Sequence, residues 1–259
     1  MSDATKPRVV LVVGATGSVG RHVVAEAVRQ GYETRALVRE AARASQLDPG
    51  AQIVVGQLTK PETLIDAVAG TDAVVFTQGA SYGDESAAEA VDYGAVKNVL
   101  AALDGRPVRI ALMTAIGVTK RSGGHDWKRR GERLVRASGN AYTIVRPGWF
   151  DYNDDDQLQI TLLQGDTRLA GSPADGVIAR HQIARVLVDS LASAAADHLT
   201  FELVAERGAA QDDLEPVFAH LDTDAADSVD GIHDRDNMQR AGEPASVLDD
   251  LAAVASPRN

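Results

Sequence analysis

A glycine-rich turn near the start of the chain constrains the fold more than any other feature. The turn is Gly14-Ala15-Thr16-Gly17-Ser18-Val19-Gly20. It directly follows a strand-like run over 8–13 that is apolar from Val9 onward, and a helical pattern of apolar residues begins in it and ends at Gly31. Such an apolar run is typical of a parallel strand buried on both faces. A tight turn from this strand into a helix presents free backbone N–H groups at a positively polarised helix end. The segment therefore predicts a phosphate-binding strand–turn–helix unit.

The glycine spacing indicates a dinucleotide pyrophosphate as the ligand of this turn. Gly14 permits the tight turn, Gly17 lets the backbone approach phosphates, and Gly20 lets the helix pack closely on the strand. Thr16, Ser18 and Val19 complete the loop, and we expect them to contact the cofactor. The spacing is Gly-x-x-Gly-x-x-Gly, which differs from the Gly-x-Gly-x-x-Gly of most Rossmann dehydrogenases. The alternative is a glycine-rich turn that binds no ligand.

Strand-like and helix-like patterns alternate through the first part of the chain. This alternation predicts right-handed βαβ crossovers and an α/β fold with a doubly wound parallel Rossmann sheet. The expected strands cover 8–13, 34–38, 53–55, 73–76, 108–113 and 142–145, and the expected helices cover 19–30, 41–47, 61–69, 86–103 and 126–138. Ligands bind such sheets at the carboxyl ends of the strands.

The alternation loosens after Arg146, so the chain divides into a core over 1–146 and substrate-side elements over 147–259 within one continuous domain. The second part should hold a short strand near 176–179, a helix over 181–191 and a late strand over 199–204. Residues 206–259 carry thirteen carboxylates against four arginines. Short amphipathic helices are expected near 212–221 and 246–254. We expect this acidic segment to pack against the body as a small C-terminal substrate lobe.

Composition excludes several classes of protein. The absence of cysteine excludes disulfide scaffolds, thiolate zinc sites and cysteine nucleophiles. A formal net charge of −11 disfavours nonspecific nucleic-acid binding. We predict no metal site, and we interpret Asp154-Asp155-Asp156 as a solvated loop. No apolar stretch reaches membrane-spanning length, and the N-terminus lacks a signal-peptide pattern. We therefore expect a soluble cytoplasmic protein with neither a nucleic-acid nor a membrane partner.

The residue after the second expected strand suggests which dinucleotide is bound. An acidic residue there usually bonds a ribose 2′-hydroxyl, whereas an arginine can hold a 2′-phosphate through paired, charge-assisted bonds. Arg39 lies 22 positions past Gly17, Arg43 could assist it, and Arg35 is a weaker candidate. Glu40 follows one residue later. The pattern favours NADP(H) over NAD(H), with an ordinary solvated arginine as the alternative.

Two further strand ends are expected to wall the adenosine half of the cofactor. Gln57 and Leu58 follow the third strand, and Gln57 could bond the adenine amine. Thr77, Gln78 and Gly79 follow the fourth strand, where small residues let the backbone pass close to the ribose.

Taken together, several of these motifs resemble the atypical short-chain dehydrogenase/reductases, in their NAD(P)H-binding, NmrA-like branch, over about residues 8–205. The resemblance rests on Gly14–Gly20, Arg39, 114–118 (Thr-Ala-Ile-Gly-Val), 128–132 (Lys-Arg-Arg-Gly-Glu) and 142–148 (Tyr-Thr-Ile-Val-Arg-Pro-Gly). It implies a catalytic hydroxyl at Thr114, a catalytic lysine at Lys128 that also bonds the nicotinamide ribose, and cofactor contacts at Pro147 and Gly148. The family's tyrosine, four residues before the lysine, is replaced by Gly124.

Two nearby features need separate interpretation. Tyr93 and Lys97 also have tyrosine-x-x-x-lysine spacing, but they lie before the fifth strand, so we interpret them as helix packing and surface. Trp149, Phe150 and Tyr152 cluster in a chain with 4% aromatic residues. They could form an apolar platform for a flat substrate, or a core plug under a loop.

The resemblance implies an NADPH-dependent oxidoreductase that transfers hydride to a small carbonyl, quinone or flavin-like acceptor. Reduction of a quinone or flavin needs no enzyme tyrosine, because solvent can protonate the product. A nonenzymatic NADP(H)-sensing regulator with a protein partner is the second hypothesis, and a nucleotide-sugar epimerase or dehydratase is a third. A homo-oligomer is compatible with all three.

Overall fold

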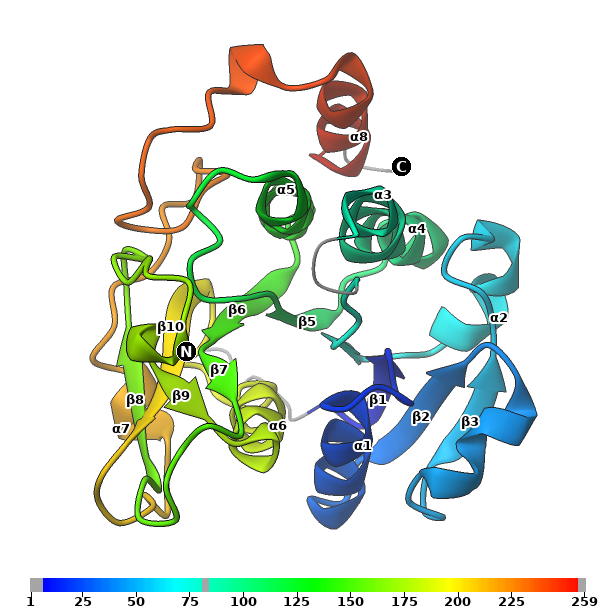
Figure 1. Ribbon diagram of the computed structural model, residues 1–259. Helices are drawn as coiled ribbons and strands as arrows, with labels where there is room; N and C mark the ends of the chain where they lie inside the picture. The colour runs from blue at the N-terminus through cyan, green and yellow to red at the C-terminus, as the bar shows by residue number, and fades with distance from the viewer. Residues whose placement is uncertain (1–6, 81–83, 256–259) are drawn as a thin grey trace.

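A mostly parallel eight-stranded sheet forms the centre of the computed structural model, which describes residues 7–80 and 84–255 (Figure 1). The strand order is β3-β2-β1-β4-β5-β6-β10-β8, and only β8 runs antiparallel to its neighbour β10 within this sheet. The strands are β1 (Val9–Val13), β2 (Glu33–Val38), β3 (Gln52–Val55), β4 (Ala73–Phe76), β5 (Arg109–Met113), β6 (Ala141–Pro147), β8 (Gln159–Leu163) and β10 (Leu199–Glu206). The expected doubly wound parallel sheet is confirmed.

Helices cover both faces of the sheet, as the continuous apolar strands require. On one face α1 (Gly20–Arg29) packs beside α6 (Arg180–Asp189), and on the other α4 (Gly94–Leu103) packs beside α5 (Gly123–Ala137) (Figure 1). Val23 and Leu187 belong to the core under the first pair, and Val96 and Leu134 to the core under the second. Among the described residues, no helix combines the length and apolarity that crossing a membrane would require.

Several expected helices are shorter or broken. The segment expected at 41–47 is a 3₁₀ turn over Ala41–Gln46 that buries no residue, because it has no apolar stripe to pack. The segment expected at 61–69 divides into a 3₁₀ turn over Pro61–Thr63 and the short α2 (Ile65–Val68). The single helix expected at 86–103 is divided into α3 (Glu85–Ala88), a π-helical turn over Glu89–Tyr93 and α4.

Helix α5 begins three residues earlier than its apolar pattern predicts. The Ser122 side chain accepts a hydrogen bond from the His125 backbone N–H and so caps the helix before Gly123. The extra turn precedes Lys128 and sets the direction in which α5 leaves the loop after β5. Helix boundaries of this kind depend on a cap rather than on hydrophobic periodicity.

The elements after β6 form an edge to the sheet. β7 (Trp149–Phe150) pairs in parallel with β9 (Val177–Ile178) as a separate two-stranded sheet. Of the two late helices, α7 (Glu215–Phe218) lies beside β8, and α8 (Ala245–Ala255) packs on α5 and α4 (Figure 1). Residues 222–243, which we term the acidic strap, connect them and run along α5.

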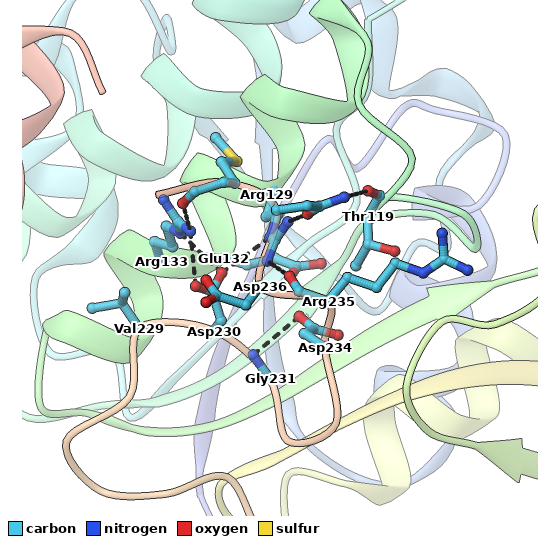
Figure 2. Close-up of polar contacts among 12 residues, drawn as sticks. Thr119, Arg129, Glu132, Arg133, Val229, Asp230, Gly231, Asp234, Arg235 and Asp236 are labelled. Atoms are coloured by element: carbon cyan, nitrogen blue, oxygen red, sulfur yellow. Dashed lines mark hydrogen bonds and ion pairs between the residues drawn. The ribbon is translucent and has the colours of Figure 1, made fainter. Parts of the chain in front are cut away.

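Buried arginines of α5 hold the acidic strap in place (Figure 2). Arg133 pairs with Asp230 at 2.7 Å and with Glu243 at 2.9 Å, and Arg129 pairs with Asp230 at 3.0 Å. Both guanidinium groups are almost fully buried. Burying a charge is costly unless it is paired and hydrogen-bonded, and here each cation has at least one carboxylate and one backbone or side-chain oxygen as partners.

A second buried cluster joins the strap to the sheet. Arg146 of β6, which has no exposed surface, pairs with Glu132 of α5 and with Asp234 of the strap, both at 2.6 Å. Oε1 of Glu202 on β10 lies 3.5 Å from the same guanidinium but makes no hydrogen bond, while Oε2 accepts the Asp166 backbone N–H. Burial raises the pKa of Glu202 to about 8, despite the opposing effect of Arg146.

The first prediction concerns Glu202→Gln. The folded protein keeps a proton on Glu202 between its ordinary pKa of 4.5 and about 8, whereas the unfolded chain releases it. The contribution of this group to stability therefore falls as pH rises through that window. The variant cannot ionise, so its melting temperature should rise relative to the wild type between pH 5.5 and 8.5, measured by thermal unfolding. Glu206→Gln, at the exposed end of the same strand, should follow the wild type, and parallel curves for all three would contradict the prediction.

The second prediction concerns the strap. Arg133→Ala removes a partner of the buried Glu243 and of the partly exposed Asp230, so the free energy of unfolding should fall by about 3–5 kcal/mol in urea denaturation. Arg29 pairs with Glu26 at the surface, and Arg29→Ala should change the same quantity by no more than about 1 kcal/mol. Equal losses in the two variants would show that the strap does not depend on this ion pair.

Candidate functional site

The glycine turn lies where three backbone segments meet. Gly14 has φ +81°, and a Cβ atom on it would lie 2.6 Å from the Gln78 backbone nitrogen. A Cβ atom on Gly20 would lie 2.1 Å from the Gly14 carbonyl oxygen. Real Cβ atoms do not approach so closely, so any side chain at Gly14 or Gly20 would push the turn, α1 and the loop after β4 apart.

The outer side of this turn is open. Thr16, Gly17 and Ser18 are exposed, whereas the Val19 side chain is buried in the core. The backbone N–H groups of Ser18 and Val19 have no hydrogen-bond partner within the described part of the chain. They lie at the start of α1, where the helix dipole favours an anion. The four residues predicted from the sequence are therefore together, with Val19 able to contribute only its backbone.

A second feature of this region fits a nucleotide. The side-chain oxygen Oε1 of Gln78 is buried and has no hydrogen-bond partner. A buried amide oxygen without a donor is unfavourable, and a ribose hydroxyl is a donor of suitable size. The close-packed glycines and this unsatisfied acceptor both fit a bound dinucleotide at the carboxyl ends of β1 and β4.

The residues predicted to contact the adenosine half of the cofactor differ in whether their side chains are free to bind it. Arg39 is exposed at the end of β2, and its guanidinium makes no hydrogen bond or ion pair among the described residues. Arg35 instead donates to the Ala69 carbonyl at 2.5 Å. Gln57 exposes its side chain beyond β3, while Leu58 packs partly into the core and its carbonyl accepts from Asn98.

At the end of β4, the Thr77 side chain has a structural role, whereas Gly79 is exposed. The Thr77 hydroxyl is buried and donates to the Val13 carbonyl at 2.9 Å, so its side chain joins β4 to β1. Gly79 is exposed, and a Cβ atom on it would lie 3.9 Å from Nζ of Lys128. The predicted catalytic lysine therefore reaches the loop after β4, which was predicted to contact the adenosine half of the cofactor.

Lys128 is held there by a residue that sequence reasoning missed. Its Nζ atom lies 2.7 Å from Oδ1 of Asp92, whose side chain is almost fully buried. The neighbouring Tyr93 and Lys97 both bond Asp250 of α8 instead. Burial and the Asp250 hydrogen bond raise the pKa of the Tyr93 hydroxyl, which makes it a poor proton donor. The side chains of Tyr93, at the end of the π-helical turn, and Lys97 of α4 are thus both engaged by α8.

Thr114 lies at the expected strand end, but its hydroxyl is not free for the catalytic role that the resemblance implies. Its hydroxyl is buried and donates to Oε1 of Glu132 at 2.7 Å. Burial opposes ionisation of Glu132, but Arg146 and Arg136 outweigh it and lower the pKa, so Glu132 stays a carboxylate and keeps this proton engaged. At Gly124, the tyrosine position, an added Cβ atom would meet nothing within 4 Å.

The aromatic side chains of the cluster do not share one environment, because successive side chains of a strand point to opposite faces. Phe150 packs against the core under α1 and α6, with the Arg180 guanidinium 5.2 Å from its ring centroid. Trp149 and Tyr152 form an edge-to-face pair with centroids 6.1 Å apart, and Tyr152 is 63% exposed. A platform could therefore involve Trp149 and Tyr152, whereas Phe150 has the core role that was the alternative.

Pro147 and Gly148 are buried beside these aromatics. A Cβ atom on Gly148 would lie 2.5 Å from the Gly176 carbonyl oxygen, so glycine is needed there for β7 to pack on β9. The Pro147 carbonyl accepts the Ile116 N–H and links β6 to the loop after β5. Both residues join neighbouring segments through backbone contacts.

The acidic loop after Tyr152 pairs with a cation of the protein itself. Arg207 bonds Asp154 at 2.7 Å and Asp156 at 2.6 Å, all at the surface. Across residues 7–80 and 84–255, no group of three or more histidine or acidic side chains is placed to hold a metal ion.

Comparisons with known proteins agree with this geometry. A family described as NAD(P)H-binding matches residues 14–194. Protein TIC 62, chloroplastic, from Pisum sativum is 30% identical over 205 residues, which cover 66% of this chain but 38% of the pea protein. This chain thus spans about two fifths of that relative. Sanguinarine reductase from Eschscholzia californica is 25% identical over 273 residues, covering 86% of this chain and 99% of the reductase.

The fold is also found among solved structures. A Bacillus halodurans protein superposes with a TM-score of 0.68 at 24% identity, covering 83% of this chain and all of that one. This likeness concerns the fold, while the family match covers the glycine turn, the strand ends and Lys128 described above. The chain belongs to the NAD(P)H-binding family of atypical short-chain dehydrogenase/reductases with a Rossmann-like fold.

Proposed function

We propose that this protein binds NADP(H) and reduces a small carbonyl, quinone or flavin-like acceptor. The observation that carries the proposal is the placement of Lys128, whose ammonium lies beside Gly79 at the end of β4, on the same edge of the sheet as the glycine turn. A lysine at this place can donate hydrogen bonds to the ribose of a nicotinamide. Such contacts fix the nicotinamide half relative to an acceptor.

The choice of NADP(H) rests on free cations at the end of β2. Arg39 and Arg43 are exposed and make no side-chain hydrogen bond or ion pair among the described residues. A 2′-phosphate would gain charge-assisted bonds from Arg39, the closer of the two to the strand end. The Ser18 and Val19 N–H groups would hold the pyrophosphate, and Gln78 would accept from a ribose hydroxyl. When bound, the cofactor supplies hydride.

The acceptor class follows from the missing proton donor. Gly124 has no side chain, and the Thr114 proton is engaged by Glu132. An alkoxide formed from an aldehyde or ketone needs a positioned acid, whereas a reduced quinone or flavin can take its proton from water. We therefore favour a flat, conjugated acceptor over a simple carbonyl.

Trp149 and Tyr152 are the side chains proposed to receive such an acceptor. An edge-to-face pair that is partly exposed offers an apolar surface for a planar ring. The similarity to a protein named sanguinarine reductase, nearly all of whose length this chain covers, supports a reductase. We propose residues 147–259 as the substrate-side part of the domain and the cytoplasm as its compartment.

A nonenzymatic NADP(H)-sensing regulator is the second candidate. The lack of an available acid at both Gly124 and Thr114 favours it, because cofactor binding does not require either group. In that case a protein partner would bind the cofactor-bound form of this protein selectively. Tight NADP(H) binding without turnover of any acceptor would support this candidate.

The third prediction tests the reductase. NADPH oxidation should be detectable with at least one member of a panel of quinones and flavins, and kcat/KM should fall at least about tenfold in Lys128→Ala because a charged hydrogen bond is lost. Lys97→Ala, which removes a lysine of the surface pair with Asp250, is the matched control and should retain activity. Absence of turnover across the panel would refute the reductase.

The fourth prediction concerns cofactor preference. Arg39→Asp should lower the ratio of NADPH to NADH affinity at least about tenfold, because a carboxylate repels the 2′-phosphate and can bond a 2′-hydroxyl. Isothermal titration calorimetry with both nucleotides measures the ratio. Arg29→Ala, at the far end of α1, should leave it unchanged. An unaltered ratio in Arg39→Asp would mean that another residue selects the cofactor.

A further inference from the structure

The π-helical turn between α3 and α4 places a buried carboxylate against α5. Asp92 lies in this turn and is 6% exposed. Its Oδ1 atom accepts from Nζ of Lys128 at 2.7 Å and from the Ala80 backbone N–H at 3.2 Å. A single oxygen therefore contacts both the lysine and the loop after β4. π-helical turns of this kind are often found at functional sites.

The packing around this carboxylate is close. A Cβ atom on Gly131 would lie 3.0 Å from the Asp92 carbonyl oxygen, so glycine at this position favours the close approach of α5 to the π-helical turn. Gly131 lies three residues after Lys128 on the same helix, so this contact also brings the lysine to Asp92. The distance between α5 and the turn is thus set by backbone and not by adjustable side chains.

The pair differs from an ordinary surface salt bridge. The Asp92 side chain is 4% exposed and that of Lys128 is 20% exposed. Lysine carries its charge on a flexible four-carbon stem, so the ammonium needs a fixed anion if it is to occupy one position. Asp92 supplies that anion, and its second donor, Ala80, belongs to the loop after β4.

We propose that Asp92 is a positioning residue that holds the Lys128 ammonium against the loop after β4, so that its remaining N–H groups face the nicotinamide ribose of NADP(H). The inference rests on the proposed cofactor. It assigns the π-helical turn a role in the nicotinamide half of the site, separate from the glycine turn and Arg39, which would hold the adenosine half.

The two halves can be tested separately with NADPH and with 2′,5′-ADP, which contains only the adenosine half. Dissociation constants are measured by calorimetry for the wild type, Asp92→Asn, Lys128→Ala and the double variant. Each single variant should weaken NADPH binding about tenfold and change 2′,5′-ADP binding less than about twofold. In the double variant, Asp92→Asn should add no further loss, because it acts only through Lys128.

Asp250→Asn is the matched control, since it removes a carboxylate that bonds Lys97 and Tyr93 on the neighbouring part of the same helix. It should bind both nucleotides as the wild type does. Unchanged 2′,5′-ADP affinity also shows that Asp92→Asn is folded, and Asp92→Ser replaces it if the amide is not tolerated.

Three results would overturn the role of Asp92: unchanged NADPH affinity, an equal loss for both nucleotides, or a further loss in the Lys128→Ala background. No binding of NADPH by the wild type would also overturn it. The reductase proposal fails by a different result, which is NADPH binding without turnover of any acceptor. In that case the NADPH and 2′,5′-ADP affinities of the variants still decide whether Asp92 positions Lys128.

Discussion

The close approach of three backbone segments at Gly14, Gly20 and Gln78 is the constraint on which the rest of the structure depends. It fixes the start of α1 directly above the end of β1 and brings the loop after β4 against the same turn. The free N–H groups of Ser18 and Val19 belong to this turn, and the unsatisfied Gln78 oxygen belongs to the loop against it. This arrangement suits a dinucleotide pyrophosphate, because free backbone N–H groups at a helix N-terminus favour a bound phosphate.

Helix α5 connects that site to the rest of the chain through two of its sides. Toward α4, Gly131 permits the contact with the π-helical turn and Lys128 reaches Asp92. Toward the acidic strap, Arg129 and Arg133 bind Asp230. Part of the acidity of the C-terminal segment is local charge compensation, because four of its carboxylates are partners for buried arginines of the body: Asp224, Asp230, Asp234 and Glu243.

The sheet and the glycine turn could be predicted from sequence because both are local. An apolar run, a glycine spacing and a helical period are each visible within about fifteen residues, and all six early strands occur where the pattern places them. Asp92 could not be found in this way, since it lies 36 positions before Lys128 and resembles any helical aspartate until the π-helical turn rotates it inward. The strap partners are still farther apart in the chain. Phe150 was ambiguous because hydrophobic side chains serve cores and binding surfaces alike.

The contacts of Thr114 and Glu132 bear directly on the chemistry. Glu132 accepts a hydrogen bond from the Thr114 hydroxyl because Arg146 and Arg136 keep the carboxylate ionised, and Arg146 in turn is held by Asp234 of the strap. The network that anchors the C-terminal segment therefore also engages the hydroxyl at the end of β5. Position 124 is glycine, and the ammonium of Lys128 lies beside Gly79 in the loop after β4. A site of this composition can orient a nicotinamide and leave protonation to water, which suits acceptors whose reduced form is stable without an enzyme acid.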